Sequence, residues 1–241
     1  MMPLIIANWK MNVTFEEAIQ FCTYIVSREY NNFPIICPPA PYLAYLSNRF
    51  KSIKFCAQDV SAIENNGAFT GEYSSLMLKQ CFVDYSLTGH SERRELFKES
   101  NEIIRQKVIS CFNASVIPII CVGEPLEIRQ SGSYKEFLLK QLSESLPNKM
   151  DFTNKNSIIL AYEPIWSIGT GMIPSDYELI ETFETIYSFL NQCNIANNVT
   201  LVYGGSVNLE NIAKILNLKN VSGVLIGKAS LDSKILAQML N

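Results

Sequence analysis

Histidine is almost missing from this sequence, since His90 is the only one among 241 residues. A single imidazole excludes metal sites built from several histidines, and no carboxylate spacing suggests a metal site either. We therefore expect no metal and no cofactor. Cys121 stands where a nucleophile could act, but no second histidine is present to activate it. We expect this cysteine to pack beside a site as a supporting residue.

An excess of charge and long apolar stretches are also absent. A net charge of -3 and a pI near 5.4 argue against a nucleic-acid-binding surface. No apolar run reaches the roughly 18 residues of a transmembrane helix. Residues 1–7 lack the charged region of a signal peptide and predict a strand. Seven cysteines, an odd count without a C-x-x-C pair, favour free thiols in a reducing cytoplasm.

What the sequence does contain is a repeated alternation of strand-like and helix-like segments. Continuous apolar runs of this kind are typical of parallel strands buried on both faces. Eight such units without a linker predict one α/β domain over residues 1–241, a closed parallel (β/α)₈ barrel. A doubly wound open sheet is the alternative, but no Gly-x-Gly-x-x-Gly follows the first run. The apolar runs are 4–7, 35–37, 53–57, 85–87, 116–122, 158–162, 201–203 and 224–226.

Helix starts can be recognised between these runs. Thr14 with Glu17, and Ser175 with Glu178, have the spacing of a capping box. The last two helices are expected over residues 208–216 and 231–240.

Polar residues that directly follow the strands of such a barrel meet at one end of it, where the active site of this fold lies. Asn8 and Lys10 follow the first strand, and a lysine there is either an ordinary surface residue or a cation placed to stabilise negative charge. His90 follows the fourth strand and opens a short helix that also contains Glu92. Because a helix N-terminus disfavours imidazolium, we expect a neutral ring that donates a hydrogen bond.

The segment after the sixth strand combines a carboxylate with two hinges. Pro164 restricts the backbone beside Glu163, and Gly169 and Gly171 allow large dihedral changes at the far end. An ordinary surface loop is the alternative to a lid that carries Glu163 into a closed pocket. The predicted lid consists of Pro164, Ile165, Trp166, Ser167, Ile168, Gly169 and Thr170.

Glycine-rich loops follow the seventh and eighth strands, at 203–208 and 226–230. Loops at these two positions often build the phosphate site of this fold. A carboxylate base, a neutral imidazole, an ammonium group and a phosphate site together predict proton transfer on a small sugar phosphate.

At these residues the sequence resembles the triosephosphate isomerase family, from Asn8 to Leu231. The family segments Asn-x-Lys, Gly-His-Ser-Glu-Arg-Arg, Ala-Tyr-Glu-Pro-x-Trp-x-Ile-Gly-Thr-Gly and Tyr-Gly-Gly-Ser-Val occur in order. The resemblance implies a TIM barrel that interconverts dihydroxyacetone phosphate and D-glyceraldehyde 3-phosphate in glycolysis and gluconeogenesis. It also implies that Glu163 is the base, that His90 moves protons between the substrate oxygens, and that Lys10 and Asn8 hold the substrate.

The resemblance further assigns the substrate phosphate to the backbone amides of Gly169, Ser206, Gly227 and Lys228. In similar proteins the loop after the third strand, here 58–75, inserts into a second subunit. An exposed aromatic residue argues for a partner. We therefore expect a homodimer with Phe69 and Thr70 at the contact.

Two positions depart from the common family pattern. Ser167 replaces the usual alanine of the lid, and Lys228 replaces the second glycine of a phosphate loop. Other phosphate-binding barrels, such as those of tryptophan or histidine biosynthesis, use different acid–base sets. A non-catalytic phosphate-binding barrel or scaffold is the alternative from another class, and it predicts loss of Glu163, His90 or Lys10.

Overall fold

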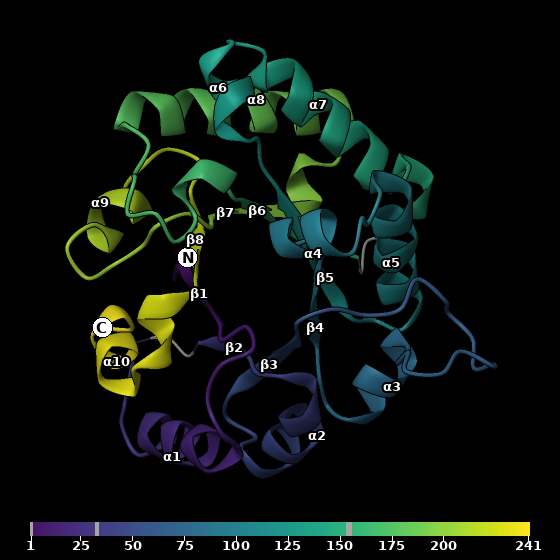
Figure 1. Ribbon diagram of the computed structural model, residues 1–241, viewed down its shortest axis with the longest axis vertical. Helices are drawn as coiled ribbons and strands as arrows, with labels where there is room; N and C mark the ends of the chain where they lie inside the picture. Colours follow the sequence, from purple (N-terminus) through teal and green to yellow (C-terminus); the bar gives the residue numbers. More distant parts are fainter. Residues whose placement is uncertain (1, 32–33, 153–155) are drawn as a thin grey trace.

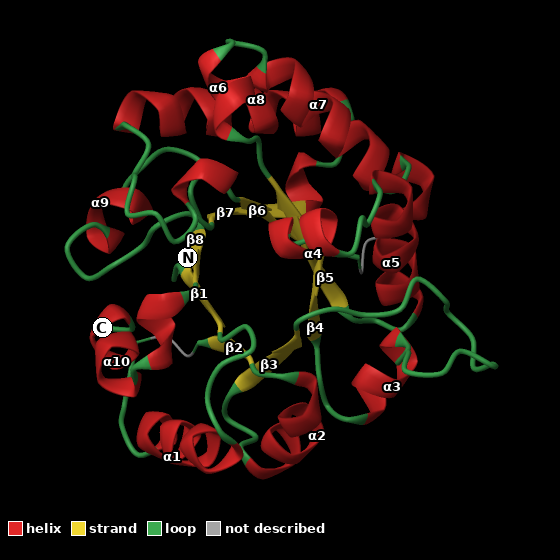
Figure 2. Cartoon of the chain, viewed as in Figure 1, coloured by secondary structure: helices red, strands yellow, loops and turns green. Residues whose placement is uncertain are grey.

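Eight parallel strands form a closed ring in the computed structural model, which describes residues 2–31, 34–152 and 156–241. Neighbours in the ring follow chain order, and the first strand closes it by pairing with the last, from Leu4 opposite Gly223 to Ala7 opposite Ile226. The predicted closed barrel is confirmed (Figure 2). The strands are β1 (Leu4–Asn8), β2 (Ile35–Cys37), β3 (Lys54–Ala57), β4 (Tyr85–Thr88), β5 (Ile117–Val122), β6 (Ile158–Tyr162), β7 (Val199–Tyr203) and β8 (Gly223–Ile226).

Helices surround the ring on its outside (Figure 1). None of those in the described ranges is long and apolar enough to cross a membrane. The α-helices are α1 (Phe15–Val26), α2 (Ala40–Arg49), α3 (Ser75–Gln80), α4 (Ser91–Leu96), α5 (Asn101–Asn113), α6 (Leu126–Gln130), α7 (Tyr134–Ser145), α8 (Asp176–Gln192), α9 (Ile212–Leu216) and α10 (Ser233–Met239). Short 3₁₀ segments are η1 (Lys149–Asp151), η2 (Ile165–Ser167), η3 (Ala196–Asn198) and η4 (Lys228–Leu231).

The strands are apolar throughout because each of their faces meets a separate core. Ile5 and Ala7 pack outward among the helix side chains, whereas Ile6 between them points into the barrel. The side chains that point into the barrel are mostly aliphatic, and they include three cysteine thiols that pack there as apolar groups. Its buried members are Ile6, Ile35, Cys37, Cys56, Leu87, Ile119, Cys121, Ile159, Ala161, Val202 and Leu225.

Both predicted capping boxes are present at the starts of α1 and α8. The helix expected over 208–216 is shorter, and α9 begins only at Ile212. The Asn208 side chain accepts hydrogen bonds from the amides of Glu210 and Asn211 at 2.9 and 3.0 Å, and the Ile212 amide donates to the Asn208 carbonyl at 3.1 Å. Residues 208–211 therefore form a capped turn that leads into the helix. The last helix begins later than expected as well, because Asp232 caps it and η4 occupies the preceding residues.

The connection between β3 and α3 is the long one predicted from the sequence. It reaches away from the barrel beside α3 and α5, as Figure 2 shows. Phe69 near its tip is 47% exposed, and Thr70 is exposed as well. An aromatic side chain therefore lies in solvent on a projecting loop in the single chain.

Candidate active site

A cavity of about 730 Å³ lies at the carboxyl ends of the strands. Residues that follow β1, β4, β6, β7 and β8 line it, so five segments that are far apart in sequence meet there. All predicted catalytic and substrate-contacting residues are among them: Asn8, Lys10, His90, Glu163, Gly169, Ser206, Gly227 and Lys228.

Glu163 and His90 face each other in this cavity. Both side chains are buried, at 2% and 5% exposure, and His90 Nε2 lies 3.7 Å from Glu163 Oε1. The second carboxylate oxygen, Oε2, is buried and has no hydrogen-bond partner in the described part of the chain. Gly204 permits this packing, because a Cβ there would lie 2.6 Å from Glu163 Cγ. The carboxylate thus keeps an oxygen free to accept a proton.

His90 is the N-cap of α4. Its Nδ1 accepts a hydrogen bond from the amide of Glu92 at 3.2 Å, which leaves Nε2, the nitrogen nearer to Glu163, as the ring nitrogen that can donate. The Glu92 carboxylate also lies 3.5 Å from Nδ1, but Lys10 Nζ contacts the same carboxylate at 2.7 Å and neutralises its charge.

Lys10 has a backbone conformation that side chains rarely adopt, with φ at 53°. Two side chains hold it. Asn8 Oδ1 accepts from the Lys10 amide at 3.0 Å, and Gln58 Nε2 donates to the Lys10 carbonyl at 2.8 Å. The sequence did not identify Gln58, although its place directly after the third strand was a signal. The Lys10 side chain reaches toward the loop after β8, since a Cβ at Gly227 would lie 3.9 Å from Lys10 Cε.

Cys121 ends the inward face of β5 and is fully buried next to Glu163. Burial, together with the neighbouring Glu163 carboxylate, raises the pKa of the thiol well above its ordinary value. A neutral buried thiol is a poor nucleophile, so the structure supports a packing role.

The lid segment begins as a short 3₁₀ turn and ends in solvent. Pro164 and Ser167 are buried, Ile165, Trp166 and Ile168 are half-buried, and residues 169–173 are exposed. Gly169 and Gly171 have positive φ angles of 70° and 79°, which explains why glycine stands at both positions.

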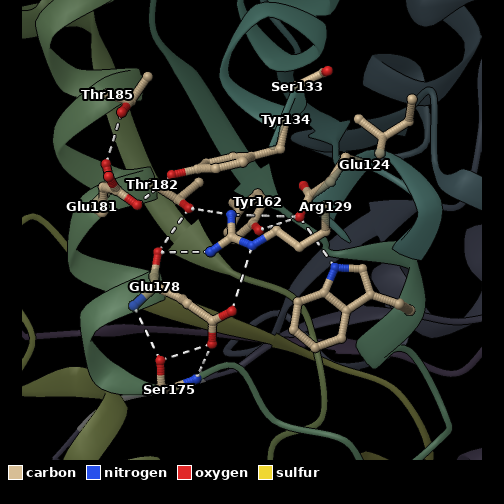
Figure 3. A network of polar contacts seen from close by, with 12 residues as sticks. Glu124, Arg129, Ser133, Tyr134, Tyr162, Ser175, Glu178, Glu181, Thr182 and Thr185 are labelled. Atoms are coloured by element: carbon tan, nitrogen blue, oxygen red, sulfur yellow. Dashed lines mark hydrogen bonds and ion pairs between the residues drawn. The ribbon is translucent and has the colours of Figure 1, made fainter. Parts of the chain in front are cut away.

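The start of the lid is fixed to Glu124, which directly precedes α6. Trp166 Nε1 and Tyr162 OH both donate to Glu124 Oε1, at 3.1 and 3.0 Å. Arg129 continues this network, with Nη1 3.8 Å from Glu124 and Nε 3.6 Å from Glu178 (Figure 3). Glu178 closes the capping box of α8, the helix that follows the lid. One polar network therefore links the beginning of the lid to the start of α8.

The two glycine-rich loops lie on one side of the cavity. The φ angle of Lys228 is not positive, and the residue is exposed at the start of η4. A lysine therefore fits without backbone strain where the family usually has glycine. Within the described ranges, no group of three or more histidine, cysteine or acidic side chains is arranged to hold a metal ion.

Comparison with known proteins gives the family. The family model described as triosephosphate isomerase matches residues 3–241. The triosephosphate isomerase of Orientia tsutsugamushi strain Ikeda is 42% identical over 248 residues, covering all of this chain and 97% of the relative. That of Thermodesulfovibrio yellowstonii is 38% identical over 95% of this chain and 94% of its own length. A crystal structure of the Bartonella henselae enzyme superposes with a TM-score of 0.85 at 32% identity, covering 99% of this chain and 98% of that one. The chain therefore belongs to the triosephosphate isomerase family of isomerases.

Proposed function

We propose that the protein interconverts dihydroxyacetone phosphate and D-glyceraldehyde 3-phosphate in the cytoplasm, as a step of glycolysis and gluconeogenesis. The observation that carries the proposal is the arrangement in the 730 Å³ cavity, where a buried carboxylate with one oxygen that has no hydrogen-bond partner in the described part of the chain lies 3.7 Å from the imidazole of His90. No metal or cofactor takes part in the reaction as proposed.

In this reaction Glu163 takes a proton from one substrate carbon and returns it to the neighbouring carbon. The negative charge that develops on the substrate oxygen is stabilised by the Nε2 proton of His90 and by the ammonium group of Lys10. His90 then moves protons between the two oxygens of the enediolate, and Asn8 holds the substrate beside Lys10. The hydrogen bond from the Glu92 amide to Nδ1 supports this role, because it uses Nδ1 as an acceptor and leaves Nε2 as the donor.

The substrate phosphate binds to the backbone amides of Gly169, Ser206, Gly227 and Lys228, all of which border the cavity. Closure of the lid brings Gly169 toward the phosphate. It also excludes water, which protects the enediolate from losing phosphate and strengthens each electrostatic contact in the site.

The proposal includes a homodimer in which loop 58–75 enters the partner subunit. A second cavity, of about 990 Å³, supports it: Lys10 and His90 border this cavity next to the apolar side chains of Met11, Leu96 and Phe97. Met11 is 96% exposed in the single chain. Phe69 and Thr70 of the partner loop would cover these side chains and approach the catalytic residues.

The test is a coupled assay of triose phosphate interconversion with the wild type, Glu163→Gln and Glu127→Gln. Glu127 is an exposed carboxylate on α6 and serves as the matched control. Loss of the base should lower kcat by at least about 10²-fold, the low end for positioned proton transfer, whereas the control should equal the wild type. No turnover by a folded wild-type protein would refute the proposal and leave a phosphate-binding barrel without catalysis.

A further inference from the structure

Ser167, in the middle of the lid, is fully buried and its hydroxyl has three partners. Its proton goes to the carbonyl of Met172, at 2.6 Å. The Tyr203 hydroxyl lies at 3.1 Å and must therefore donate to Ser167 Oγ. Burial raises the pKa of Tyr203 to about 12, which keeps that phenol protonated. The third partner is the backbone amide of Ser206, which donates to Ser167 Oγ at 3.2 Å.

Ser167 and Ser206 are joined by two hydrogen bonds. Besides the one from the Ser206 amide, Ser206 Oγ donates to the Ser167 carbonyl at 2.6 Å. Gly205 provides the room for this joint, since a Cβ there would lie 2.7 Å from Ser167 Oγ and 2.1 Å from the Tyr203 hydroxyl oxygen. The lid and the loop after β7 are therefore fastened to each other while residues 169–173 are exposed.

The Ser206 amide has two competing uses. It is one of the amides to which we assign the substrate phosphate, and here an oxygen of the lid accepts its hydrogen bond. A backbone amide has one proton, so a phosphate oxygen can take a full hydrogen bond only when Ser167 Oγ withdraws. An alanine at this position, the residue usual in the family, would leave the amide free.

We propose that Ser167 is a positioning residue whose hydroxyl occupies the phosphate-binding amide of Ser206 until a phosphate displaces it. Arrival of the phosphate then removes one of the hydrogen bonds that join the lid to the loop after β7, and departure of the phosphate restores it. This inference rests on the proposed function only in requiring that the cavity accepts a phosphate group.

The experiment measures the affinity for inorganic phosphate by calorimetry in the wild type, Ser167→Ala and Ser143→Ala. Ser143 is the matched control, because it is exposed on α7 and its hydroxyl donates to the Lys140 carbonyl, away from the cavity. Removing the competing acceptor should tighten phosphate binding by about two- to tenfold, the worth of one net hydrogen bond. The KM for triose phosphate should fall in parallel, whereas Ser143→Ala should bind phosphate as the wild type does.

Equal or weaker phosphate binding by a folded Ser167→Ala protein would overturn the proposal, as would equal tightening in Ser143→Ala, which would indicate an effect unrelated to the Ser206 amide. A titration of the wild type followed by amide NMR keeps the test independent of the variants' folding. Phosphate should shift the Ser206 amide resonance, and binding that leaves this resonance unchanged would refute the competition. A wild type that binds phosphate without isomerising triose phosphates would count against the proposed function alone.

Discussion

The position of a functional side chain in this site depends on the residues that form hydrogen bonds with it. Lys10 combines a rarely populated backbone conformation with the ammonium group that approaches both Glu92 and the loop after β8. Such a conformation persists only where the surroundings enforce it, and here Asn8 and Gln58 bond to the two sides of the residue. The position of the cation therefore depends on groups from β1 and from the end of β3.

The first prediction concerns the charge of the Lys228 side chain. Its exposed charge should assist the approach of a phosphate dianion without entering the reaction. Replacement by glycine is expected to leave kcat unchanged and to raise KM by about two- to fivefold at low salt, in line with the small energies of exposed charge pairs. The difference should vanish near 1 M salt, where screening is nearly complete.

Lys228→Gln is the matched variant, because it removes the charge and retains a side chain. It should reproduce the KM of the glycine variant if charge is the cause. Steady-state kinetics across salt concentrations decide the matter, and equal KM values in all three proteins would exclude any role for the charge.

The chemically distinctive residues could be predicted from sequence, whereas their supports could not. His90 and Glu163 stood out because each lies within two residues of the end of an apolar strand. Gln58 contacts a carbonyl 48 residues away, and the Ser167 hydroxyl bonds an amide 39 residues away. Contacts of this range depend on how the barrel closes, which local sequence patterns do not encode.

At the scale of elements, the predicted lid is a short segment that follows β6 and precedes α8. Glu124 before α6 accepts hydrogen bonds from Trp166 and Tyr162, and Arg129 on α6 reaches Glu178 at the start of α8. This network therefore holds the beginning of the lid. The exposed residues 169–173 are bonded to the lid itself, since Thr170 bonds the Trp166 carbonyl and the Met172 amide, and the Met172 carbonyl accepts from Ser167.

Glu124 makes this network sensitive to pH. Burial raises the pKa of its carboxyl from the ordinary 4.5, while the bonds from Trp166 and Tyr162 and the Arg129 charge oppose that shift. Between pH 4.5 and the raised value, the folded protein binds more protons at this site than the unfolded chain does. Stability contributed by this group is therefore present below the unfolded pKa and is lost as pH rises through the folded pKa.

The Glu124→Gln variant lacks this titration. The melting temperature of the wild type, relative to the variant, should fall as pH rises from 4.5 toward 8. Thermal unfolding of both proteins over that range is the measurement, and parallel curves would contradict the assigned shift. A constant offset between the curves is expected, because the glutamine amide enters a position where Oε2 has no partner.

The helix starts show which element boundaries can be predicted from the sequence. The starts of α1 and α8 were predicted because a capping box is a local device within four residues. The start of α9 was wrong by four residues, because residues 208–211 form a turn capped by Asn208 that precedes the regular helix.

At the scale of the whole molecule, the barrel could be predicted and its assembly could only be proposed. Eight strand–helix units left few alternatives to a closed ring. The surface proposed to contact a second subunit has no comparable periodic pattern in the sequence. The main indication of this contact is an exposed aromatic side chain on a long loop.

Thr70→Arg tests the assembly. A long cation at the tip of the loop cannot be buried in an interface without a partner, so we expect a monomer with strongly reduced activity. Size-exclusion chromatography with light scattering is the measurement. Thr23→Arg, at an exposed position on α1, should remain dimeric and active, and an active Thr70→Arg dimer would refute the loop as the contact.

The pairing of β1 with β8 has a consequence for synthesis of the protein. Until Gly223–Ile226 leaves the ribosome, β1 and β7 each present an unpaired row of backbone donors and acceptors. A nascent chain can build most of the ring but cannot complete it before Ile226 has left the ribosome. The two free sheet edges of a barrel that lacks one strand are therefore where such an intermediate can pair with another chain.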